Sequence, residues 1–215
     1  MKRNSRATRQ RLLWTAFQEF HRVGFHAADM ERILRRAGVT KGALYYHFEG
    51  KRALGYAVVE EVLRDWILDR WLSPLMDESD PLAAMADLAR WGERAAQPQG
   101  LSAGCPLNNL AQELCGCDEG FHQRLEAIYE EWRAGLAQLL VNAQQVGIVR
   151  PEVDARAAAT FIIGAWEGSI GLAKAHSTSE TLRYCRQGLE SYLETLRLPE
   201  SGRRERFERV VGPVY

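Results

Sequence analysis

A short N-terminal stretch carries side chains whose types and spacing suit binding to phosphates and to base edges. Thr40 and Lys41 follow a glycine–valine pair, and a Tyr-Tyr-His run begins at Tyr45. Hydroxyl, ammonium, phenol and imidazole groups donate hydrogen bonds to phosphates, and side chains near a helix N-terminus reach base edges in the major groove. The predicted partner is therefore double-stranded DNA. The residues expected to contact it are Thr8, Thr40, Lys41, Gly42, Ala43, Tyr45, Tyr46, His47 and Lys51.

The distribution of charge supports the same partner. The chain of 215 residues has 28 basic and 28 acidic residues, so its formal net charge is zero. Residues 1–52, however, hold 12 of the basic and 4 of the acidic residues, a net charge of +8 that leaves −8 for residues 53–215. Such asymmetry is typical of an anion-binding N-terminal part joined to an acidic body.

Three short helices are predicted to position these N-terminal side chains. Apolar residues recur at helical spacing over residues 12–23 and 30–37, and each run stops at a glycine, Gly24 or Gly38. A third short helix is predicted over residues 41–48. The last two helices and the tight turn between them have the plan of a helix-turn-helix, in which the first helix braces the second in the groove.

Each residue of that turn has a predicted task. Gly38 can adopt the left-handed conformation that a tight exit from the second helix requires, and Val39 can plug the core. The Thr40 hydroxyl can cap the third helix while facing a phosphate. Leu44 and Phe48 share one face of that helix and are expected to point inward.

The stretch of residues 24–54, GFHAADMERILRRAGVTKGALYYHFEGKRAL, resembles the DNA-binding domain of the TetR/AcrR family of transcriptional regulators. One departure is Ala28-Asp29 where the family commonly has Thr-Ser, so Asp29 is expected to cap the second helix. The resemblance implies a homodimer, usually a repressor, whose heads bind a palindromic operator while a variable C-terminal domain binds a small-molecule effector that alters head spacing. The residues that carry the match are Ala37–Gly42, Leu44–Phe48, Lys51 and Leu54, with Ala16, Phe20 and Gly24 in register.

The remainder of the chain also has helical periodicity, so the fold is predicted to be all-α. The expected domains are a helix-turn-helix domain over residues 1–52, a helical ligand-binding and dimerisation domain over 53–199, and a charged tail over 200–215. The Gln97–Gly104 stretch is expected to be a loop. The expected helices of the body are one from Lys51 that Pro74 ends or kinks, Leu82–Ala96 capped by Asp80, Gly104–Leu114, one capped by Asp118 that ends near Gly147, Ala155–Ala175 capped by Asp154, and a last one with a Ser177–Glu180 capping box that ends at Pro199.

Aromatic residues in the body are candidates for lining a cavity that binds an apolar or aromatic effector. Core packing is the alternative for each tryptophan, because large apolar side chains at helical spacing also fill a helical core. Polar groups such as Asn108 could orient a ligand or face solvent. The candidate ligand-binding residues are Trp66, Trp91, Cys105, Leu107, Asn108, Leu110, Trp132, Phe161 and Trp166.

Small residues on the penultimate helix indicate a close helix–helix contact. Each glycine in a helix costs about 1 kcal/mol relative to alanine, so a cluster of glycines invites a packing explanation. A four-helix interface between two protomers, built from the last two helices, is one explanation, and close packing within one protomer is the alternative. The small residues are Ala157, Ala158, Gly164, Ala165, Gly168, Ser169 and Gly171.

The cysteines suggest alternatives to effector binding. Cys105 lies at a predicted helix N-terminus, which favours the reactive thiolate, so a redox- or electrophile-sensing regulator is one alternative and a buried structural cysteine is another. A cysteine-dependent enzyme is more distant, because nothing places His122 or His176 beside Cys105, and no catalytic residue is assigned. Cys115-Gly116-Cys117 lacks the two-pair spacing of a zinc site, so no metal or other cofactor is expected.

Location and compartment are also predicted from composition. No run of about 18 apolar residues exists to span a membrane, and the basic N-terminus leads into an amphipathic pattern rather than a signal-peptide core. Four cysteines are too few for a disulfide framework. We therefore expect a soluble cytoplasmic protein with no membrane partner.

Overall fold

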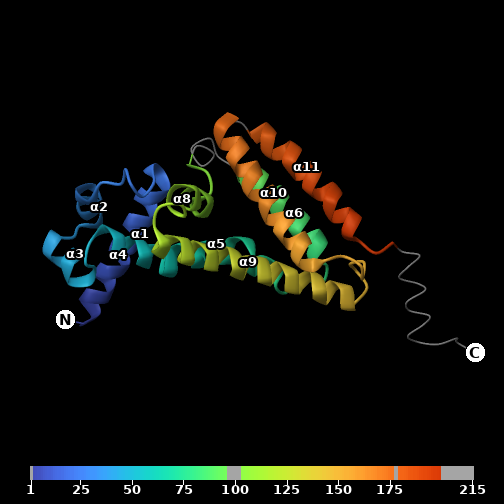
Figure 1. Cartoon of the computed structure of the whole chain (residues 1–215), viewed down its shortest axis with the longest axis horizontal. Coiled ribbons are helices and arrows are strands. Elements are labelled where there is room, and N and C mark those ends of the chain that lie inside the picture. The colour runs from blue at the N-terminus through green and yellow to red at the C-terminus, as the bar shows by residue number, and fades with distance from the viewer. Residues whose placement is uncertain (1, 96–102, 177–178, 200–215) are drawn as a thin grey trace, which may run out of the picture. The chain divides into compact units, whose positions relative to one another are not determined.

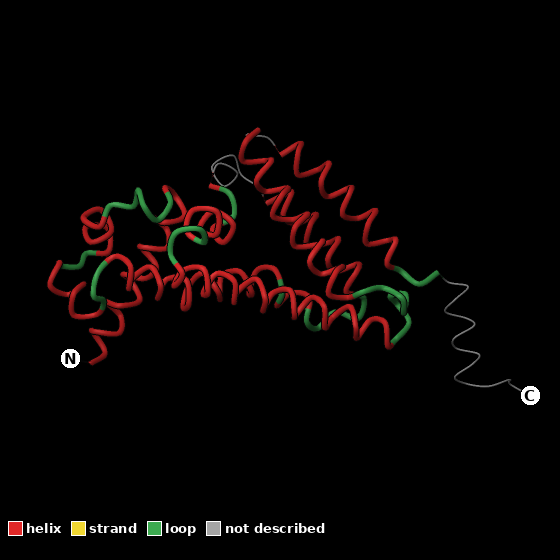
Figure 2. The backbone as a smooth tube through the Cα atoms, viewed as in Figure 1, coloured by secondary structure: helices red, strands yellow, loops and turns green. Residues whose placement is uncertain are grey.

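The chain folds almost entirely into helices (Figures 1 and 2). The computed structural model describes residues 2–95, 103–176 and 179–199. Within these ranges the only extended pairing is a single antiparallel bridge between Val149 and Arg197, so the all-α prediction is confirmed. The helical segments are α1 (Lys2–Val23), α2 (Met30–Ala37), α3 (Lys41–His47), α4 (Lys51–Val58), η1 (Val59–Leu63), α5 (Arg64–Trp71), η2 (Ser73–Leu75), α6 (Pro81–Ala95), α8 (Pro106–Leu114), α9 (Glu119–Gln145), α10 (Ala155–His176) and α11 (Ser179–Leu196).

The helices form two compact units that differ from the predicted division of the chain. Unit 1 comprises Met1–Asp69 and Ala103–Glu130, and unit 2 comprises Arg70–Ser102 and Glu131–Tyr215. Helices α5 and α9 therefore contribute residues to both units. The predicted boundary at residue 52 rests on the charge distribution and the helix-turn-helix motif rather than on packing, and it stays a prediction.

An aromatic cluster in unit 1 joins the N-terminal helices to the start of α9. The Phe25 ring lies 5.2 Å from Phe20 and 4.8 Å from Phe121, and Tyr56 lies 4.7 Å from Phe121 between ring centroids. The Tyr56 hydroxyl also donates a hydrogen bond to the Asp118 carboxylate at 2.7 Å. Residues after Ala103 thus complete the core on which the predicted DNA-binding helices rest.

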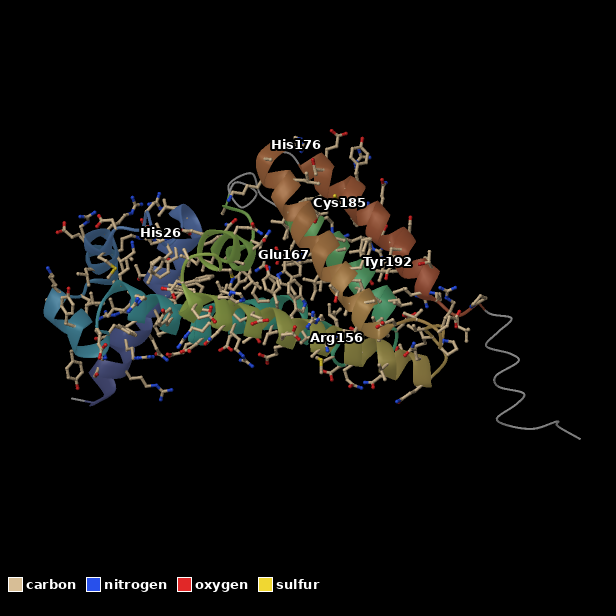
Figure 3. The ribbon with its side chains drawn as sticks, viewed as in Figure 1. His26, Arg156, Glu167, His176, Cys185 and Tyr192 are labelled. Carbon is tan, nitrogen blue, oxygen red and sulfur yellow. The ribbon has the colours of Figure 1, made fainter. Side chains whose placement is uncertain are left out.

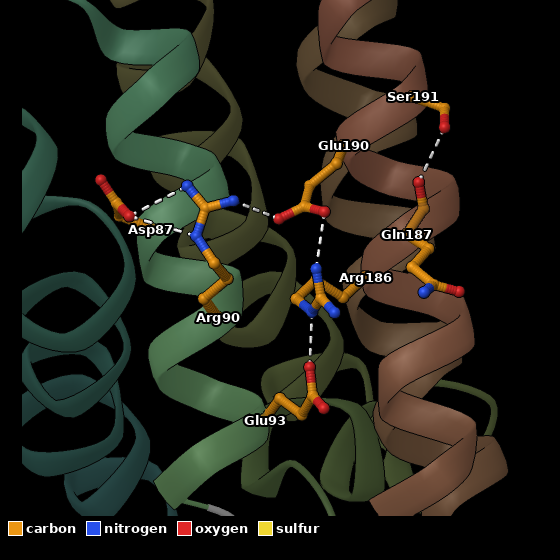
Figure 4. A network of polar contacts seen from close by, with 7 residues as sticks. All are labelled: Asp87, Arg90, Glu93, Arg186, Gln187, Glu190 and Ser191. Atoms are coloured by element: carbon orange, nitrogen blue, oxygen red, sulfur yellow. Dashed lines mark hydrogen bonds and ion pairs between the residues drawn. The ribbon is translucent and has the colours of Figure 1, made fainter.

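A chain of ion pairs joins α6 to α11 in unit 2 (Figure 4). Arg90 on α6 binds Asp87 on its own helix and Glu190 on α11. Arg186 on α11 binds Glu190 at 2.6 Å and reaches back to Glu93 on α6. Because Glu93, Arg186 and Glu190 are largely buried side chains, these pairs fix the register of the two helices more firmly than exposed pairs would.

Most predicted helix caps are confirmed. Gly38 is left-handed at φ +61°, and the Asp29 carboxylate accepts from the Glu31 N–H at 2.9 Å. The Thr40 hydroxyl accepts from the Ala43 N–H at 3.2 Å, which starts α3. The carboxylates of Asp80, Asp118 and Asp154 each accept from N–H groups in the first turn of α6, α9 and α10.

The helix that follows Lys51 departs from the prediction of one uninterrupted helix. It changes from α4 to a π-helical turn over Val59–Leu63 and then continues as α5 to Trp71, while Pro74 lies in the 3-10 turn η2. A π turn adds one residue to the α repeat, and a pattern based on the regular 3.6-residue period does not anticipate it.

Three predictions fall wholly or partly outside the described residues. In the expected Gln97–Gly104 loop, only Ala103 and Gly104 are described, and Ala103 is helical. Ser177 of the expected capping box and the 200–215 tail are not described. The last helix begins at Ser179 and ends at Leu196, three residues before Pro199.

Candidate DNA-binding surface and ligand cavity

Helix α3 presents one buried face and one exposed face. Leu44 and Phe48 are 3% and 6% exposed, which confirms that they point inward. Tyr45 and Tyr46 are 58% and 78% exposed. Lys41 and Gly42 at the start of the helix are also exposed. Apolar burial on one side therefore orients a cation and two phenols outward from a single short helix.

The remaining predicted residues of the turn and α3 lie at the edges of this exposed face. Thr40 is exposed, and its hydroxyl oxygen accepts the capping hydrogen bond, so its proton remains available for an acceptor. Ala43 and His47 are half-buried, as is Val39, the predicted core plug. The His47 ring contacts Tyr46 edge-on at 4.9 Å, which holds both rings on one side of the helix.

The N-terminal helix supplies fewer free cations than its sequence suggests. Thr8 is half-buried on α1. The Arg9 guanidinium forms an ion pair with Glu61 and lies 5.2 Å from the Phe48 ring centroid. The hydrogen bond with Glu61 raises the pKa of Arg9. Arg9 thus ties α1 to η1 and braces the end of α3.

Lys51 has a structural role that the sequence did not reveal. Its ammonium donates to the carbonyl oxygens of His26 at 3.0 Å and Ala28 at 2.6 Å, and burial lowers its pKa. Two of its three donors are therefore engaged by the turn between α1 and α2. One donor remains for the DNA contact predicted from sequence.

Buried Glu19 binds three arginines of unit 1. Its side chain is 1% exposed and contacts Arg22 on α1 and Arg32 and Arg36 on α2. The hydrogen bond from Arg22, and then the charges of all three arginines, lower the pKa of Glu19. From the sequence, these arginines were counted toward the positive charge of residues 1–52, and their shared partner was missed. The available signal was the i, i+3 spacing of Glu19 and Arg22, and no local spacing links Glu19 to Arg32 or Arg36.

A carboxylate from α8 holds the turn between α1 and α2. The two oxygens of Glu113 accept hydrogen bonds from the backbone N–H groups of Phe25 and His26 at 2.8 and 2.7 Å. Gly24 precedes these residues with φ +84°, and a Cβ there would lie 2.7 Å from a Glu113 oxygen. No sequence signal links positions so far apart, so Glu113 was missed.

Unit 2 contains a small apolar cavity of about 30 Å³. Three tryptophan side chains lie on its wall, and the Trp71 and Trp166 rings meet at 4.6 Å between centroids. A space of this size holds roughly two water molecules. Residues from α5, η2, α6, α9, α10 and α11 line it: Trp71, Leu75, Met85, Leu88, Ala89, Trp132, Leu136, Ile162, Trp166 and Leu189.

The structure divides the predicted ligand-binding residues among several places. Trp132 and Trp166 line the cavity, and Trp91 lines a separate groove of about 450 Å³ in the same unit. Phe161 is 52% exposed on α10 and packs against Tyr192, which Figure 3 labels. The others belong to unit 1, and their role in binding a ligand stays a prediction: half-buried Trp66 and Asn108, and buried Cys105, Leu107 and Leu110.

The four cysteines form no disulfide with one another. Cys105 is the N-cap of α8 and is 5% exposed. Burial raises the pKa of Cys115, and Cys117 is exposed with its sulfur 4.0 Å from His26 Nε2. No group of three metal-ligating side chains occurs in the described part of the chain.

These features define a class of protein. A capped glycine turn followed by a short helix with an outward Lys and two Tyr side chains is a helix-turn-helix, and the second unit adds a helical body with an aromatic cavity. Within the described ranges, no helix has both the length and the apolar character to cross a membrane. The class is therefore that of helix-turn-helix regulators of transcription.

Family models place the chain within that class. The model described as "Bacterial regulatory proteins, tetR family" matches residues 12–58, and the model "Tetracyclin repressor-like, C-terminal domain" matches residues 81–189. The chain belongs to the TetR family of transcriptional regulators, which confirms the resemblance drawn from residues 24–54.

Similar proteins support the assignment over most of the chain. The chain is 30% identical over 172 residues to the transcriptional regulator AcuR of Cereibacter sphaeroides, covering 77% of this chain and 75% of that one. It is 28% identical to the transcriptional repressor DhaR of a Mycobacterium species, covering 81% and 86% of the two chains. A TetR transcriptional regulator from Chloroflexus aurantiacus superposes with a TM-score of 0.80 at 28% identity, covering 92% of this chain and all of that one.

Proposed function

We propose that the protein is a homodimeric repressor that binds a palindromic operator through α3 and leaves it when a small apolar effector enters the cavity of unit 2. The observation that carries the proposal is the exposed face of α3, on which Lys41, Tyr45 and Tyr46 face solvent while Leu44 and Phe48 are buried. DhaR, a relative over 81% of the chain, is named a repressor, which supports the direction of control.

Each predicted DNA contact has a distinct task in the proposal. Lys41 and Gly42 begin α3, where a side chain reaches base edges and a glycine admits close backbone approach. Thr40, Tyr45, Tyr46 and His47 donate to phosphates and fix the register of the helix on the duplex. Ala43 packs against the groove wall, and Thr8 and the third donor of Lys51 reach backbone phosphates farther out.

An exposed apolar face of α10 supports the homodimer. Phe161 and Leu172 are 52% and 50% exposed, and Gly164 and Gly168 have open space where a Cβ would point. Ala157 and Gly171 of the same small-residue set are exposed, and Ala165 is half-buried. Ala158 and Ser169 are 2% and 4% exposed, so these two members of the set follow the alternative, close packing within one protomer.

Release follows from a difference in effector affinity between two states. A ligand shifts an equilibrium only as far as it prefers one state over the other. If the state with a filled cavity separates the two α3 helices by other than the roughly 34–36 Å between successive major grooves, operator affinity falls. Helices α5 and α9 each contribute residues to both units and are therefore the proposed path by which a change in unit 2 affects unit 1.

Cys105 is a weaker basis for regulation than the cavity. Its place at the start of α8 favours thiolate, but a thiol that is 5% exposed offers little surface to an oxidant or electrophile. The same burial opposes its use as an enzymatic nucleophile. We therefore propose effector binding rather than cysteine chemistry.

Operator selection tests the proposal. The full-length protein should enrich a palindromic sequence from a pool of random duplexes, and Lys41→Ala should bind the enriched duplex at least tenfold more weakly at fixed salt. Tyr46→Phe, which removes one phosphate donor, should weaken binding by a smaller factor. Arg94→Ala, which removes an exposed cation from α6, is the matched control. Failure to enrich any duplex, or equal affinity of Lys41→Ala and wild type, contradicts the proposal.

A further inference from the structure

Two side chains that line the cavity of unit 2 carry buried hydrogen-bond donors that lack acceptors. Nε1 of Trp132 and Nε1 of Trp166 are buried, and neither has a hydrogen-bond partner among the described residues. Both tryptophans line the cavity, one from α9 and one from α10. A buried donor without an acceptor is unfavourable relative to the same donor in water, so a ligand that supplies an acceptor gains affinity.

The other lining side chains have no hydrogen-bond acceptor for a donor on the ligand and no charge to pair with a charged ligand. Of the ten described lining side chains, all but these two are alkyl groups, one thioether and the indole of Trp71. None is a lysine, arginine or histidine. Glu167, which is 6% exposed on α10 (Figure 3), is acidic and offers no positive charge to an anion. An anionic ligand or one with an unpaired donor would thus be buried without compensation.

The size of the cavity limits the ligand to a compact molecule. Its volume of about 30 Å³ admits only a few heavy atoms, so a six-membered ring enters only as the wall moves. Met85 is the flexible part of that wall, because an unbranched thioether repacks easily. The Trp166 ring is less free, since it packs against Gly92, where a Cβ would lie 2.6 Å from its Cη2 atom.

We propose that the effector is a compact, neutral molecule with an apolar body and a hydrogen-bond acceptor but no donor, of the ketone, ester or ether class. Its acceptor receives a hydrogen bond from the indole of Trp132, of Trp166, or of both. This assignment rests on the proposed function, because it takes the cavity of unit 2 as the effector site.

Three probes with the same ring separate the chemical classes. Cyclohexanone carries an acceptor alone, cyclohexanol adds a donor, and cyclohexanecarboxylate adds a negative charge. Their affinities for the full-length protein are measured by titration without DNA. Cyclohexanone should bind most tightly, with cyclohexanol about fivefold weaker and the carboxylate weaker still, since one neutral hydrogen bond changes affinity by about this factor.

Indole N–H signals identify the site of binding. The chain has six tryptophans, so protein labelled with ¹⁵N at tryptophan gives up to six indole signals, each assigned by a Trp→Phe variant. Cyclohexanone should shift the proton signals of Trp132 and Trp166 downfield, as hydrogen-bonded N–H protons do, and leave that of Trp14 in place. The signals report on contact even if a variant is too unstable for titration.

Variants separate hydrogen bonding from packing. Trp132→Phe and Trp166→Phe remove the donor and keep an aromatic ring, and each should reduce the preference for cyclohexanone over cyclohexanol. Trp14→Phe, at an exposed residue of α1 outside the cavity lining, is the matched control and should keep the preference. The assignment is overturned by equal affinity for ketone and alcohol, by tighter binding of the carboxylate, or by no shift of either indole signal up to the solubility of cyclohexanone. Because DNA is absent, these outcomes are independent of operator binding by α3.

Discussion

Glu113 and Phe25 are joined by a hydrogen bond of 2.8 Å from a backbone N–H to a carboxylate oxygen, and the second oxygen accepts from the next N–H, that of His26. Glu113 lies on α8, whereas Phe25 lies in the turn that leads to α2. The turn is closed from its other side by Lys51, which donates to two of its carbonyl oxygens. The start of the helix-turn-helix is therefore fixed partly by a residue far along the chain.

Replacing Glu113 by alanine should lower the free energy of unfolding by about 2 kcal/mol, because two N–H groups lose a charged acceptor. Urea denaturation of the full-length protein measures the loss. The control is Glu126→Ala on α9, which removes an exposed carboxylate that lies 3.9 Å from His122 Nε2. It should change the free energy of unfolding by less than about 0.5 kcal/mol. Equal stability of the two variants would contradict the role assigned to Glu113.

Glu19 should make the stability of the protein depend on pH in the acid range. Arginine contacts lower its pKa in the folded state below the unfolded value of about 4.3, so its contribution is complete above that value and is lost as pH falls through the folded pKa. Glu19→Gln, which keeps the shape, should lose about 3 kcal/mol at neutral pH. The gap between variant and wild type should narrow as pH falls below about 4. Thermal melts across pH test this, and a gap that stays constant or widens in acid argues against it.

Gly92 should be intolerant of a methyl group despite its place in a helix. A Cβ there would lie 2.6 Å from Trp166, so the indole must shift, at a cost of about 1–3 kcal/mol that exceeds the helix-propensity gain of alanine. Gly188→Ala on α11 has open space and should be neutral or stabilising in the same melts. If Gly92→Ala is as stable as Gly188→Ala, the packing of Trp166 differs from that described.

A charge on the exposed face of α10 should prevent dimerisation. Phe161→Glu places a carboxylate on the face that the proposed interface buries, where its desolvation is unfavourable. Sedimentation velocity at micromolar concentration should show a dimer for wild type and mainly monomer for the variant. Met76→Glu, at a site of similar exposure directly after η2, should remain dimeric. A monomeric wild type, or a dimeric Phe161→Glu, counts against this face.

Local signals in the sequence predicted most of the fold. Gly38, Asp29 and Thr40 act on backbone groups within a few residues of themselves, so their roles as helix stops and caps could be derived without knowledge of the rest of the chain. The inward direction of Leu44 and Phe48 follows equally from helical spacing.

Contacts between distant residues were beyond local reasoning. The spacing of the tryptophans did not indicate which of them lie close together in the fold. Of the six, Trp71, Trp132 and Trp166 line the cavity, and Trp71 is not in the set of candidate ligand-binding residues. The sequence could not separate Ala158 and Ser169 from the exposed small residues, because small side chains suit an interface between protomers and packing within one protomer equally well. The clamp by Glu113 depends on tertiary packing that no short pattern encodes.

The ion pairs of Glu19 also change how strongly salt should act on DNA binding. A cation of the protein that neutralises a phosphate releases the counterion bound there. The logarithm of the DNA-binding constant therefore falls with the logarithm of the salt concentration, with a slope of about −0.9 for each neutralised phosphate. Arg22, Arg32 and Arg36 share a buried carboxylate, and Arg9 is paired with Glu61, so four of the twelve cations in residues 1–52 already have a fixed counterion in the protein itself. The salt slope should therefore reflect the free cations of the head and fall short of what its basic residues, counted from the sequence, imply.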